Sequence, residues 1–260
     1  MVVGSIVGAV LAGGKGSRFW PFSDLVPKPL VPVGDLEKPV LEYIVSWLAK
    51  NGVDRIGLLV GYRYRQIRNY FGDGSRWGVR LGYSVDDPYD PEPLVGDPVN
   101  GYRNTGGALL KAVRRGVLPG DHIVVWYGDI IADVDVRGLI RAHLGSGAVA
   151  TIVVARDYRV PVGVPVLDGD RVVELREKPW LGVKPTIGVL VIERSGLLGA
   201  EEVLGRGFDI MGDLIPHFIR GGLLVKAFVH RGHWYDVGSI ERYQKIPREI
   251  LGVLNRMIDN

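Results

Sequence analysis

LAGGKGSRFWPFSDLVPKP, residues 11–29, is the segment from which the architecture of this chain can be predicted. It continues a short apolar and largely β-branched run, Ser5–Leu11, which predicts a buried strand. Gly13, Gly14 and Gly16 come directly after that strand. Glycines at such a point let the chain turn with positive φ and let backbone N–H groups approach an anion closely. The segment therefore predicts a strand, a tight turn and a phosphate-binding loop.

Cationic residues stand around the same turn. Lys15 lies between the glycines and Arg18 follows them. Lys28 is flanked by Pro27 and Pro29, which restrict the backbone around its ammonium group. A glycine-rich turn without any phosphate remains an alternative for the glycines alone. The positioned cations favour a phosphate ligand.

Two common phosphate-binding motifs are absent from this segment. A P-loop needs Gly-x4-Gly-Lys-Ser/Thr, whereas Ala9 stands at the first position and Gly16 follows Lys15. A dinucleotide fingerprint counted from Gly14 would need its third glycine where Phe19 stands. The second mismatch argues against a Rossmann oxidoreductase.

The composition is that of an ordinary globular protein. The chain has 260 residues, 47% hydrophobic and 23% charged, which is enough to bury a full core. Its 32 basic and 29 acidic residues are spread along the sequence without a Lys/Arg block, so nucleic-acid binding has little support. A net charge of +3 suits an enzyme whose substrates are phosphates.

Targeting and redox signals are also absent from the sequence. There is no cysteine, which excludes disulfides and thiolate chemistry. The apolar start MVVGSIVGAVLAGG lacks a basic n-region, and no apolar run approaches the roughly 20 residues needed to span a bilayer. We therefore expect a cytoplasmic protein without membrane contact. The scarcity of Asn, Gln, Cys and Met indicates a heat-adapted source.

Strand and helix patterns alternate along the chain. The predicted strands are residues 5–11, 54–60, 80–85, 122–127, 148–154 and 186–192, with a hairpin over 164–176. The predicted helices are residues 38–50, 64–71, 105–115, 136–144, 211–219 and 239–258. This alternation predicts an α/β fold with a doubly wound, mostly parallel (Rossmann-like) mixed sheet, in a single catalytic domain over residues 1–260. We expect Thr105, Asp133 and Asp135 to cap helices. Residues 86–104, with four prolines, form a long loop of the kind that is usually functional or disordered.

Several strings resemble a known enzyme family. LAGGKGSR (11–18) and PKPLVPVG (27–34) resemble the signature of the sugar-1-phosphate nucleotidyltransferases, in which Gly-Gly-x-Gly-Thr-Arg is usual and Ser17 here keeps the hydroxyl. FGDGSRWGVRLGYS (71–84) resembles the mannose-1-phosphate guanylyltransferase branch. NTGGAL (104–109) stands where the family usually has Gly-Thr-Ala-Gly-Ala-Leu. The resemblance covers nearly the whole chain and implies the fold of nucleotide-diphospho-sugar transferases.

The resemblance also implies an activity. Family members join a nucleoside triphosphate to a sugar 1-phosphate and release pyrophosphate, with GTP and mannose 1-phosphate as the substrates that the 71–84 string suggests. The alternatives are a thymidylyl-, uridylyl- or cytidylyltransferase, an enzyme with another acceptor such as phosphocholine or an amino sugar, and a non-catalytic homologue that binds nucleotide sugars. No nucleic-acid or membrane partner is expected, and a homo-oligomer is left open.

Two aspartates are candidate ligands of Mg²⁺. Asp129 follows the apolar run HIVVWYG, at the strand edge where open α/β sheets place ligands, and Asp236 precedes a glycine turn in HWYDVGS. A turn or cap role is the alternative for either one alone. The family's metal-binding aspartates fall in Gly-Asp and Trp-x-Asp-x-Gly contexts, and both contexts are present here.

The remaining site residues follow from the same resemblance. Arg18 and Lys28 are expected to hold the triphosphate as catalytic residues. Nucleotide binding is expected at Leu11, Ala12, Gly13, Gly14, Lys15, Gly16 and Gly107. Sugar-phosphate binding is expected at Gly163, Glu177, Lys178 and Thr186, where Glu177-Lys178 alone could equally be an exposed surface pair.

Overall fold

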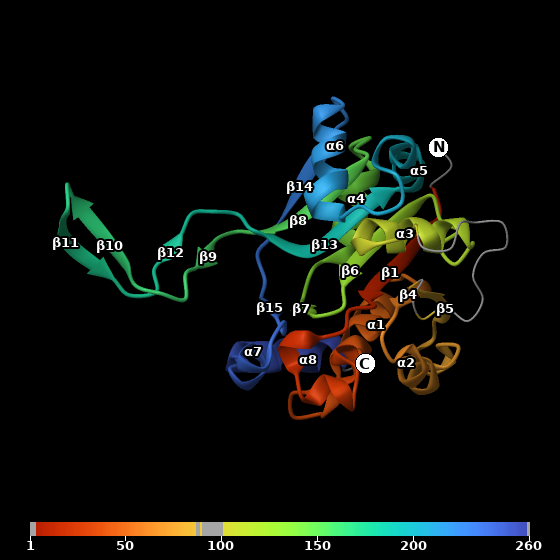
Figure 1. The fold of residues 1–260 in the computed structure, drawn as a ribbon, viewed down its shortest axis with the longest axis horizontal. Coiled ribbons are helices and arrows are strands. Elements are labelled where there is room, and N and C mark those ends of the chain that lie inside the picture. Colours follow the sequence, from red (N-terminus) through yellow and green to blue (C-terminus); the bar gives the residue numbers. More distant parts are fainter. Residues whose placement is uncertain (1–3, 87–88, 90–100, 259–260) are drawn as a thin grey trace.

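A computed structural model describes residues 4–86, 89 and 101–258 (Figure 1). Its centre is a seven-stranded sheet in the order β14-β8-β13-β6-β1-β4-β5. The bounds of these strands are β1 Ile6–Ala12, β4 Arg55–Val60, β5 Arg80–Val85, β6 His122–Tyr127, β8 Ala150–Ala155, β13 Thr186–Glu193 and β14 Val225–His230. Strand β1 runs parallel to β4 and β6, β4 is parallel to β5, β14 is parallel to β8, and β13 is antiparallel to both of its neighbours. The predicted mostly parallel, doubly wound sheet is confirmed.

The register brings the carboxyl ends of four strands to one edge of the sheet. In β1, Ala12 pairs with Val60 of β4 and Leu11 with Tyr127 of β6. Val60 pairs in turn with Val85 of β5. The segments that follow these strands therefore lie side by side, as ligand-binding loops do in open α/β sheets.

Helices cover both faces of the sheet. Their bounds are α1 Val40–Lys50, α2 Tyr64–Phe71, α3 Asn104–Arg114, α4 Val136–Leu144, α5 Arg194–Leu204, α6 Ile215–Arg220, α7 Ile240–Gln244 and α8 Arg248–Ile258. Alternate residues of one strand point to opposite faces, so Val124 packs in the core with α1, α2, α4 and α8, while Val125 packs with α3, α5 and α6. Because both faces are buried, the central strands are continuous apolar runs.

Short elements connect these layers. The 3₁₀ turns are η1 Ser17–Phe19, η2 Phe22–Asp24, η3 Lys28–Leu30 and η4 Ser75–Trp77, and η6, Ile210–Leu214, is a π-helix. The small paired strands are β2 Pro32–Val33 with β3 Lys38–Pro39, β7 Ile130–Ala132 with β15 Trp234–Asp236, β9 Tyr158–Arg159 with β12 Trp180–Leu181, and β10 Val164–Asp168 with β11 Arg171–Arg176. Strands β9 to β12 form an arm that projects from the body (Figure 1). No described helix has the length and apolarity that crossing a membrane requires.

Some predicted boundaries were wrong, and the reasons are local. The helix expected over 239–258 is divided into α7 and α8, because Pro247 cannot continue a helix. The helix expected over 211–219 is a π-helix followed by α6, with Pro216 in the first turn of α6. Asp135 caps α4 as expected, accepting a hydrogen bond from Gly138 N at 2.8 Å. Thr105 is not a cap, since α3 already begins at Asn104.

A buried histidine ties α4 to the sheet. His143 is 1% exposed, and its Nε2 lies 3.1 Å from His122 Nδ1 in β6. Its Nδ1 lies 3.0 Å from Thr151 Oγ1 in β8. Burial lowers the pKa of His143 from 6.5 to about 4, with a smaller effect of the same sign from His122. The ring is therefore neutral in the folded protein at neutral pH.

Acidification should destabilise the fold through His143. Because its pKa is lower in the folded than in the unfolded chain, its contribution is complete above about pH 6.5 and is lost as the pH falls towards about 4. The free energy of unfolding should fall by up to about 3 kcal/mol across this window. Urea unfolding of His143→Gln at several pH values should show a flatter dependence than the wild type, whereas the control His217→Gln should not. Equal slopes in all three proteins would contradict this role.

Candidate active site

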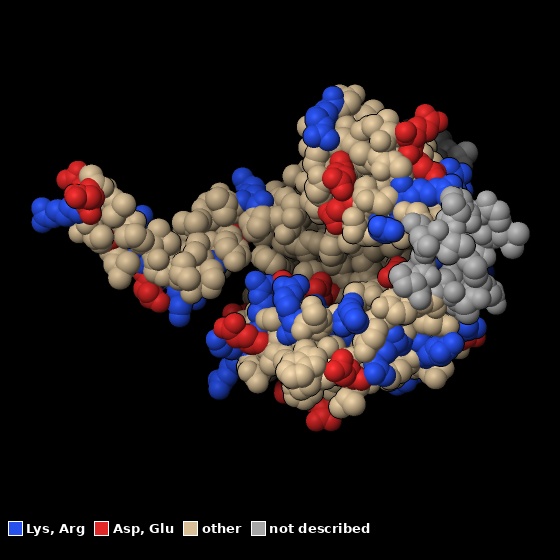
Figure 2. Space-filling view, viewed as in Figure 1, with Lys and Arg blue, Asp and Glu red and all other residues tan. Residues whose placement is uncertain are grey.

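A cavity of about 550 Å³ opens where the four strands end. The glycine loop, Lys28 and Pro29, the start of α3 and the segment after β6 line it. Figure 2 shows the corresponding hollow between the upper and lower parts of the body, with Lys and Arg side chains along its lower rim and some Asp and Glu side chains among them. Lys and Arg side chains at the rim of a cavity attract an anionic ligand.

The glycine loop forms one wall of this cavity. Leu11, Ala12, Gly13, Gly14, Gly16 and Arg18 all belong to the lining, as expected. Gly16 has φ of 65°, the left-handed conformation that glycine adopts at no steric cost, and η1 begins directly after it. This turn brings Arg18 to the cavity. Lys15 is exposed and lies outside the lining.

Lys28 is held in place within the cavity. Pro27 has an extended backbone before η3, and Pro29 is in the first turn of η3. Lys28 Nζ lies 2.6 Å from Asp129 Oδ2 and 5.6 Å from the centroid of the buried Phe19 ring. The ion pair and the aromatic face both stabilise a cation at this point.

The β7–β15 pairing brings the two candidate aspartates together. Asp236 pairs with Ile130, the residue after Asp129, and Val237 N donates to Asp129 O at 2.9 Å. Arg242 forms an ion pair with Asp236 Oδ2. Gly238 lines the cavity, and a Cβ added there would lie 2.6 Å from Asp236 Oδ1. Only glycine therefore lets the chain turn this closely around the carboxylate.

This pair of carboxylates fits a divalent cation. Asp236 Oδ1 is buried and has no hydrogen-bond partner among the described residues. Burial raises the pKa of Asp236, and the nearby charge of Asp129 raises it further. A cation relieves such repulsion, and Mg²⁺ prefers one or two carboxylates together with phosphate oxygens and water.

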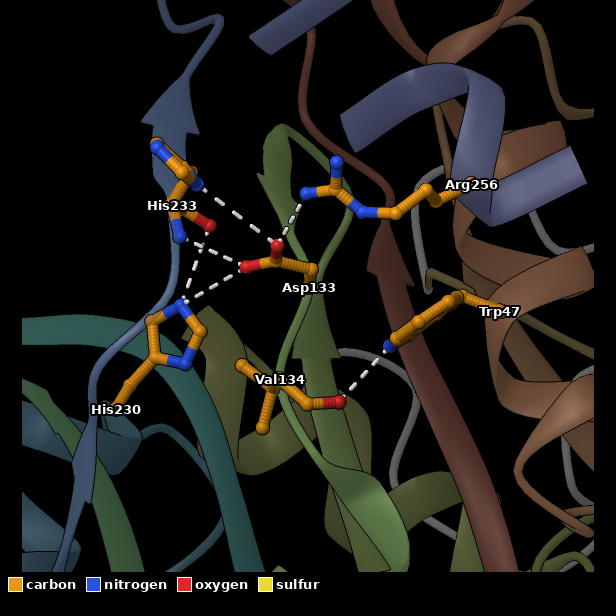
Figure 3. A network of polar contacts seen from close by, with 6 residues as sticks. All are labelled: Trp47, Asp133, Val134, His230, His233 and Arg256. Carbon is orange, nitrogen blue, oxygen red and sulfur yellow. Dashed lines mark hydrogen bonds and ion pairs between the residues drawn. The ribbon is translucent and has the colours of Figure 1, made fainter. Parts of the chain in front are cut away.

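Asp133 anchors the turn that leads into β15 (Figure 3). Its carboxylate accepts hydrogen bonds from Arg256 Nη2 at 2.6 Å and from His233 N at 2.8 Å, and His230 Nε2 lies 3.4 Å away. Burial alone would raise the pKa of Asp133, but these three groups hold it well below its usual range. The expectation that Asp133 caps α4 was wrong, because its side chain binds α8 and the β14–β15 turn instead. These contacts fix the start of β15 and thereby help to position Asp236, the last residue of that strand.

A second polar cluster borders the cavity on the α3 side. Thr105 Oγ1 donates to Asp209 Oδ2 at 2.7 Å and accepts from Ile210 N at 2.9 Å. Burial raises the pKa of Tyr127 to about 12, so its hydroxyl stays protonated. Thr105 and Tyr127 both line the cavity, and sequence reasoning identified neither as a site residue. The sequence did offer one signal for Thr105, because it is a polar residue at the start of a predicted helix, close to where the strands end.

Gly107 has a packing role in the structure. It lies outside the cavity lining, and a Cβ there would come within 2.2 Å of Arg206 O. The glycine therefore allows α3 to pack against the segment before η6. Packing against Arg206 therefore explains why position 107 is a glycine, and a direct contact with a nucleotide is not needed.

The expected sugar-side residues lie on the arm or at its base. Glu177 and Lys178 follow β11, are exposed, and lie 3.7 Å apart between Oε1 and Nζ. A Cβ on Gly163 would be 3.2 Å from Glu177 Oε2, so Gly163 neighbours Glu177. Thr186 is the exposed first residue of β13. All four lie outside the cavity lining, and their sugar-binding role stays a prediction.

Comparison with protein families gives a match over most of the chain. The model described as "Nucleotidyl transferase" matches residues 7–252, a span that includes the cavity, both aspartates and the arm.

The chain belongs to the nucleotidyl transferase family.

Similar proteins agree with this assignment. The UTP–glucose-1-phosphate uridylyltransferase of Synechocystis sp. is 31% identical to this nucleotidyl transferase over 259 residues, covering 96% of the present chain. The chain spans 64% of the length of that relative.

Two solved structures share the fold. A Bacillus anthracis protein named as a glucose-1-phosphate thymidylyltransferase, crystallised with a sucrose, has a TM-score of 0.72 at 21% identity, covering 95% of this chain and 99% of the other. HddC from Yersinia pseudotuberculosis, in complex with GMP-PN, has a TM-score of 0.65 at 23% identity, covering 93% and 97%.

Proposed function

We propose that this nucleotidyl transferase joins a nucleoside triphosphate to a sugar 1-phosphate, giving a nucleotide sugar and pyrophosphate. The observation that carries the proposal is the convergence of the glycine loop, Arg18, Lys28 and Asp129 on one cavity, with Asp236 beside Asp129. The name of the 31% identical relative supports the same class of substrates.

The proposed reaction is a displacement at the α-phosphorus. A phosphate oxygen of the sugar 1-phosphate forms a bond to that phosphorus, and the bond to the β-phosphate breaks, so its electron pair leaves with pyrophosphate. No general base is needed, because the attacking phosphate is already ionised near neutral pH. The protein then has to align the two substrates and neutralise charge.

Different residues of the site bind the triphosphate and the metal ion in this proposal. Backbone N–H groups of the glycine loop and the side chains of Arg18 and Lys28 bind the triphosphate and stabilise the charge that develops on pyrophosphate. Asp129 and Asp236 hold Mg²⁺ in this proposal. When bound, the ion neutralises phosphate oxygens and helps to orient them.

A substrate matrix tests the reaction class. Pyrophosphate release is measured for ATP, GTP, CTP, UTP and dTTP, each with mannose 1-phosphate, glucose 1-phosphate, another hexose 1-phosphate and phosphocholine. Turnover with a sugar 1-phosphate supports the proposal, and turnover only with phosphocholine contradicts it. Absence of turnover together with tight binding of a nucleotide sugar would favour a non-catalytic homologue.

The sugar also remains to be assigned. The 71–84 string favours mannose 1-phosphate with GTP, whereas the name of the Synechocystis relative favours glucose 1-phosphate with UTP. We propose the mannose derivative first and the glucose derivative second. A preference of more than about tenfold for another combination, some 1.4 kcal/mol in transition-state binding, would contradict the first choice.

Lys178→Ala should weaken the use of sugar 1-phosphate and leave nucleotide binding nearly unchanged. Lys178 has φ of 47°, a left-handed conformation that is uncommon outside glycine and that persists at functional sites. Loss of a charge-assisted contact to phosphate in a closed complex should cost roughly 2–3 kcal/mol, visible as a higher KM for the sugar 1-phosphate.

The matched control is Lys184→Ala, which removes another exposed lysine of the arm. An exposed ion pair contributes about 0–1 kcal/mol, so neither variant should lower the melting temperature appreciably. Unchanged kinetics in Lys178→Ala would show that Glu177 and Lys178 form only a surface pair.

A further inference from the structure

The arm carries an apolar surface that the proposed reaction does not use. Strands β10 and β11 form a sheet of two strands that projects from the body (Figure 1), and no third strand joins it in the described part of the chain. Most of the visible surface of the arm is neither acidic nor basic (Figure 2). A sheet of two strands is marginally stable in water unless its apolar side packs against another surface.

The side chains on one face of this hairpin are all apolar. Pro165 pairs with Leu175 and Leu167 pairs with Val172, and directly opposed residues of an antiparallel pair share a face. Because Pro165 and Leu167 are two residues apart, both pairs lie on the same face. Val173 is the unpaired residue of a β-bulge, two residues before Leu175 and on the same side. These five residues make up the apolar face of the arm.

The apolar face of the arm is open to solvent. Four of its side chains are more than half exposed: Leu167, Val172, Val173 and Leu175. The opposite face carries Glu174 and Arg176, which are joined by two hydrogen bonds of 3.0 Å. Exposed apolar side chains continue towards the base of the arm, where Val162, Trp180 and Val183 are also more than half exposed. Contiguous apolar surface of this kind on a protein marks an interaction site.

The charges of the arm differ between its two ends. The outer end, residues 164–174, has three acidic residues and one basic residue. The base of the arm, residues 156–163 and 175–185, has five basic residues and two acidic ones. Two copies of the arm laid antiparallel would therefore place the acidic end of each against the basic base of the other. The anionic surface of a membrane would instead repel the acidic end.

We propose that the apolar face of the arm is an interface with a second copy of this chain, in which two arms pack antiparallel about a two-fold axis. The two hairpins then form a four-stranded sandwich around one apolar layer, which a single hairpin lacks. A two-fold contact uses the same surface on both copies, so the assembly closes as a dimer. The inference goes beyond the proposed function and does not depend on the reaction.

Sedimentation velocity tests the association. The wild type should pass from monomer to dimer as its concentration rises from about 1 to 100 µM. Leu175→Lys should raise the dissociation constant at least about tenfold, because each dimer would bury two unpaired ammonium groups. The control Val203→Lys changes a side chain that is 71% exposed in the last turn of α5, outside the arm, and should associate like the wild type.

The substitution at Leu175 should leave the single chain folded, since this side chain is 67% exposed. The circular dichroism of the dilute protein should therefore match that of the wild type. A wild type that stays monomeric at about 100 µM would overturn the proposal, whether the apolar face then binds another protein or a membrane. Equal dissociation constants for Leu175→Lys and Val203→Lys would overturn it as well.

A cross-link tests which surfaces meet. The chain has no cysteine, so one introduced thiol reports on one position. With a flexible bismaleimide linker, Leu175→Cys should give a covalent dimer far more efficiently than Val203→Cys. Equal cross-linking of the two variants would show that the dimer uses another surface and would overturn the proposal.

A charge reversal tests the antiparallel arrangement. Asp168→Lys combined with Asp170→Lys makes both ends of the arm basic, so the dissociation constant should rise about tenfold at low salt, and the effect should shrink at high salt. The control Asp54→Lys combined with Glu202→Lys reverses two exposed charges of the body and should leave association unchanged. An unchanged dissociation constant in the arm variant would overturn the antiparallel packing.

Discussion

Lys28→Met should lower kcat by about 100- to 1,000-fold at saturating substrates, the range expected when one positioned group that stabilises developing charge is removed. Methionine keeps the length of the side chain and lacks the ammonium group. Lys28 Nζ lies 2.6 Å from Asp129 Oδ2, and Lys28 is flanked by prolines on both sides, so its ammonium group is held in place within the cavity. Initial rates of pyrophosphate release give the measurement.

Measuring the stability of Lys28→Met shows whether its loss of turnover is due to misfolding. The Lys28–Asp129 pair is partly exposed, so its loss should change the free energy of unfolding by only about 1 kcal/mol. The melting temperature should then shift by roughly 2–4 °C. Lys226→Met on the edge strand β14 removes an exposed lysine outside the cavity and should change neither quantity. Turnover of Lys28→Met within about threefold of the wild type would remove Lys28 from the reaction.

The glycine loop and the central strands could be predicted because their signals are local. A β-branched run followed by Gly13 and Gly14 specifies a buried strand and a turn through its own composition. The predicted helix Tyr64–Phe71 matches α2, since the apolar period of a helix lies within one segment. Where a proline interrupted such a period, as at Pro247, the boundary was wrong.

The hydrophobic periodicity of the sequence could not predict which residues far apart in the chain lie close together in the fold. Strands β7 and β15 have three residues each, too few to show an alternating pattern, and their pairing is what joins Asp129 to Asp236. The family resemblance supplied that pair, while the structure supplied its neighbours. Asp133 illustrates the same limit, because its partners Arg256 and His233 lie far along the sequence.

The arm formed by β9 to β12 is the part of the structure that the sequence predicts least well. The predicted hairpin is confirmed, but its turn lies one residue later than expected, at Gly169 and Asp170, because Asp168 still pairs with Arg171. Gly169 takes φ of 62° there. The direction in which a hairpin leaves the body depends on its flanking segments and carries no short-range signal. Val172, Val173 and Leu175 are all more than half exposed on it. Glu177 and Lys178 lie outside the cavity lining, so their roles depend on the kinetic test.

Asp129→Asn and Asp236→Asn should each lower turnover by a few hundredfold, about 3–4 kcal/mol in transition-state stabilisation. Asparagine is nearly isosteric with aspartate and keeps one carbonyl oxygen, so both variants should fold. Each removes one negative charge from a site whose other ligands are substrate oxygens and water, and Mg²⁺ relies on carboxylates. Weaker Mn²⁺ binding, measured by electron paramagnetic resonance in the absence of substrates, should accompany the loss, and high Mg²⁺ or Mn²⁺ should restore part of the turnover. The control Asp135→Asn should keep both properties, because asparagine caps α4 as well as aspartate does.

The double variant tests whether the two carboxylates share one ion. Residues that act as a unit are not additive, so Asp129→Asn combined with Asp236→Asn should lose much less than the product of the two single losses. Losses that multiply would indicate separate tasks, with Asp129 acting through its pair with Lys28 and Asp236 through its pair with Arg242. Near-normal turnover in one single variant would remove that residue from the metal site. Near-normal turnover in both would contradict the proposed mechanism, because neutralising the leaving pyrophosphate would then need neither carboxylate.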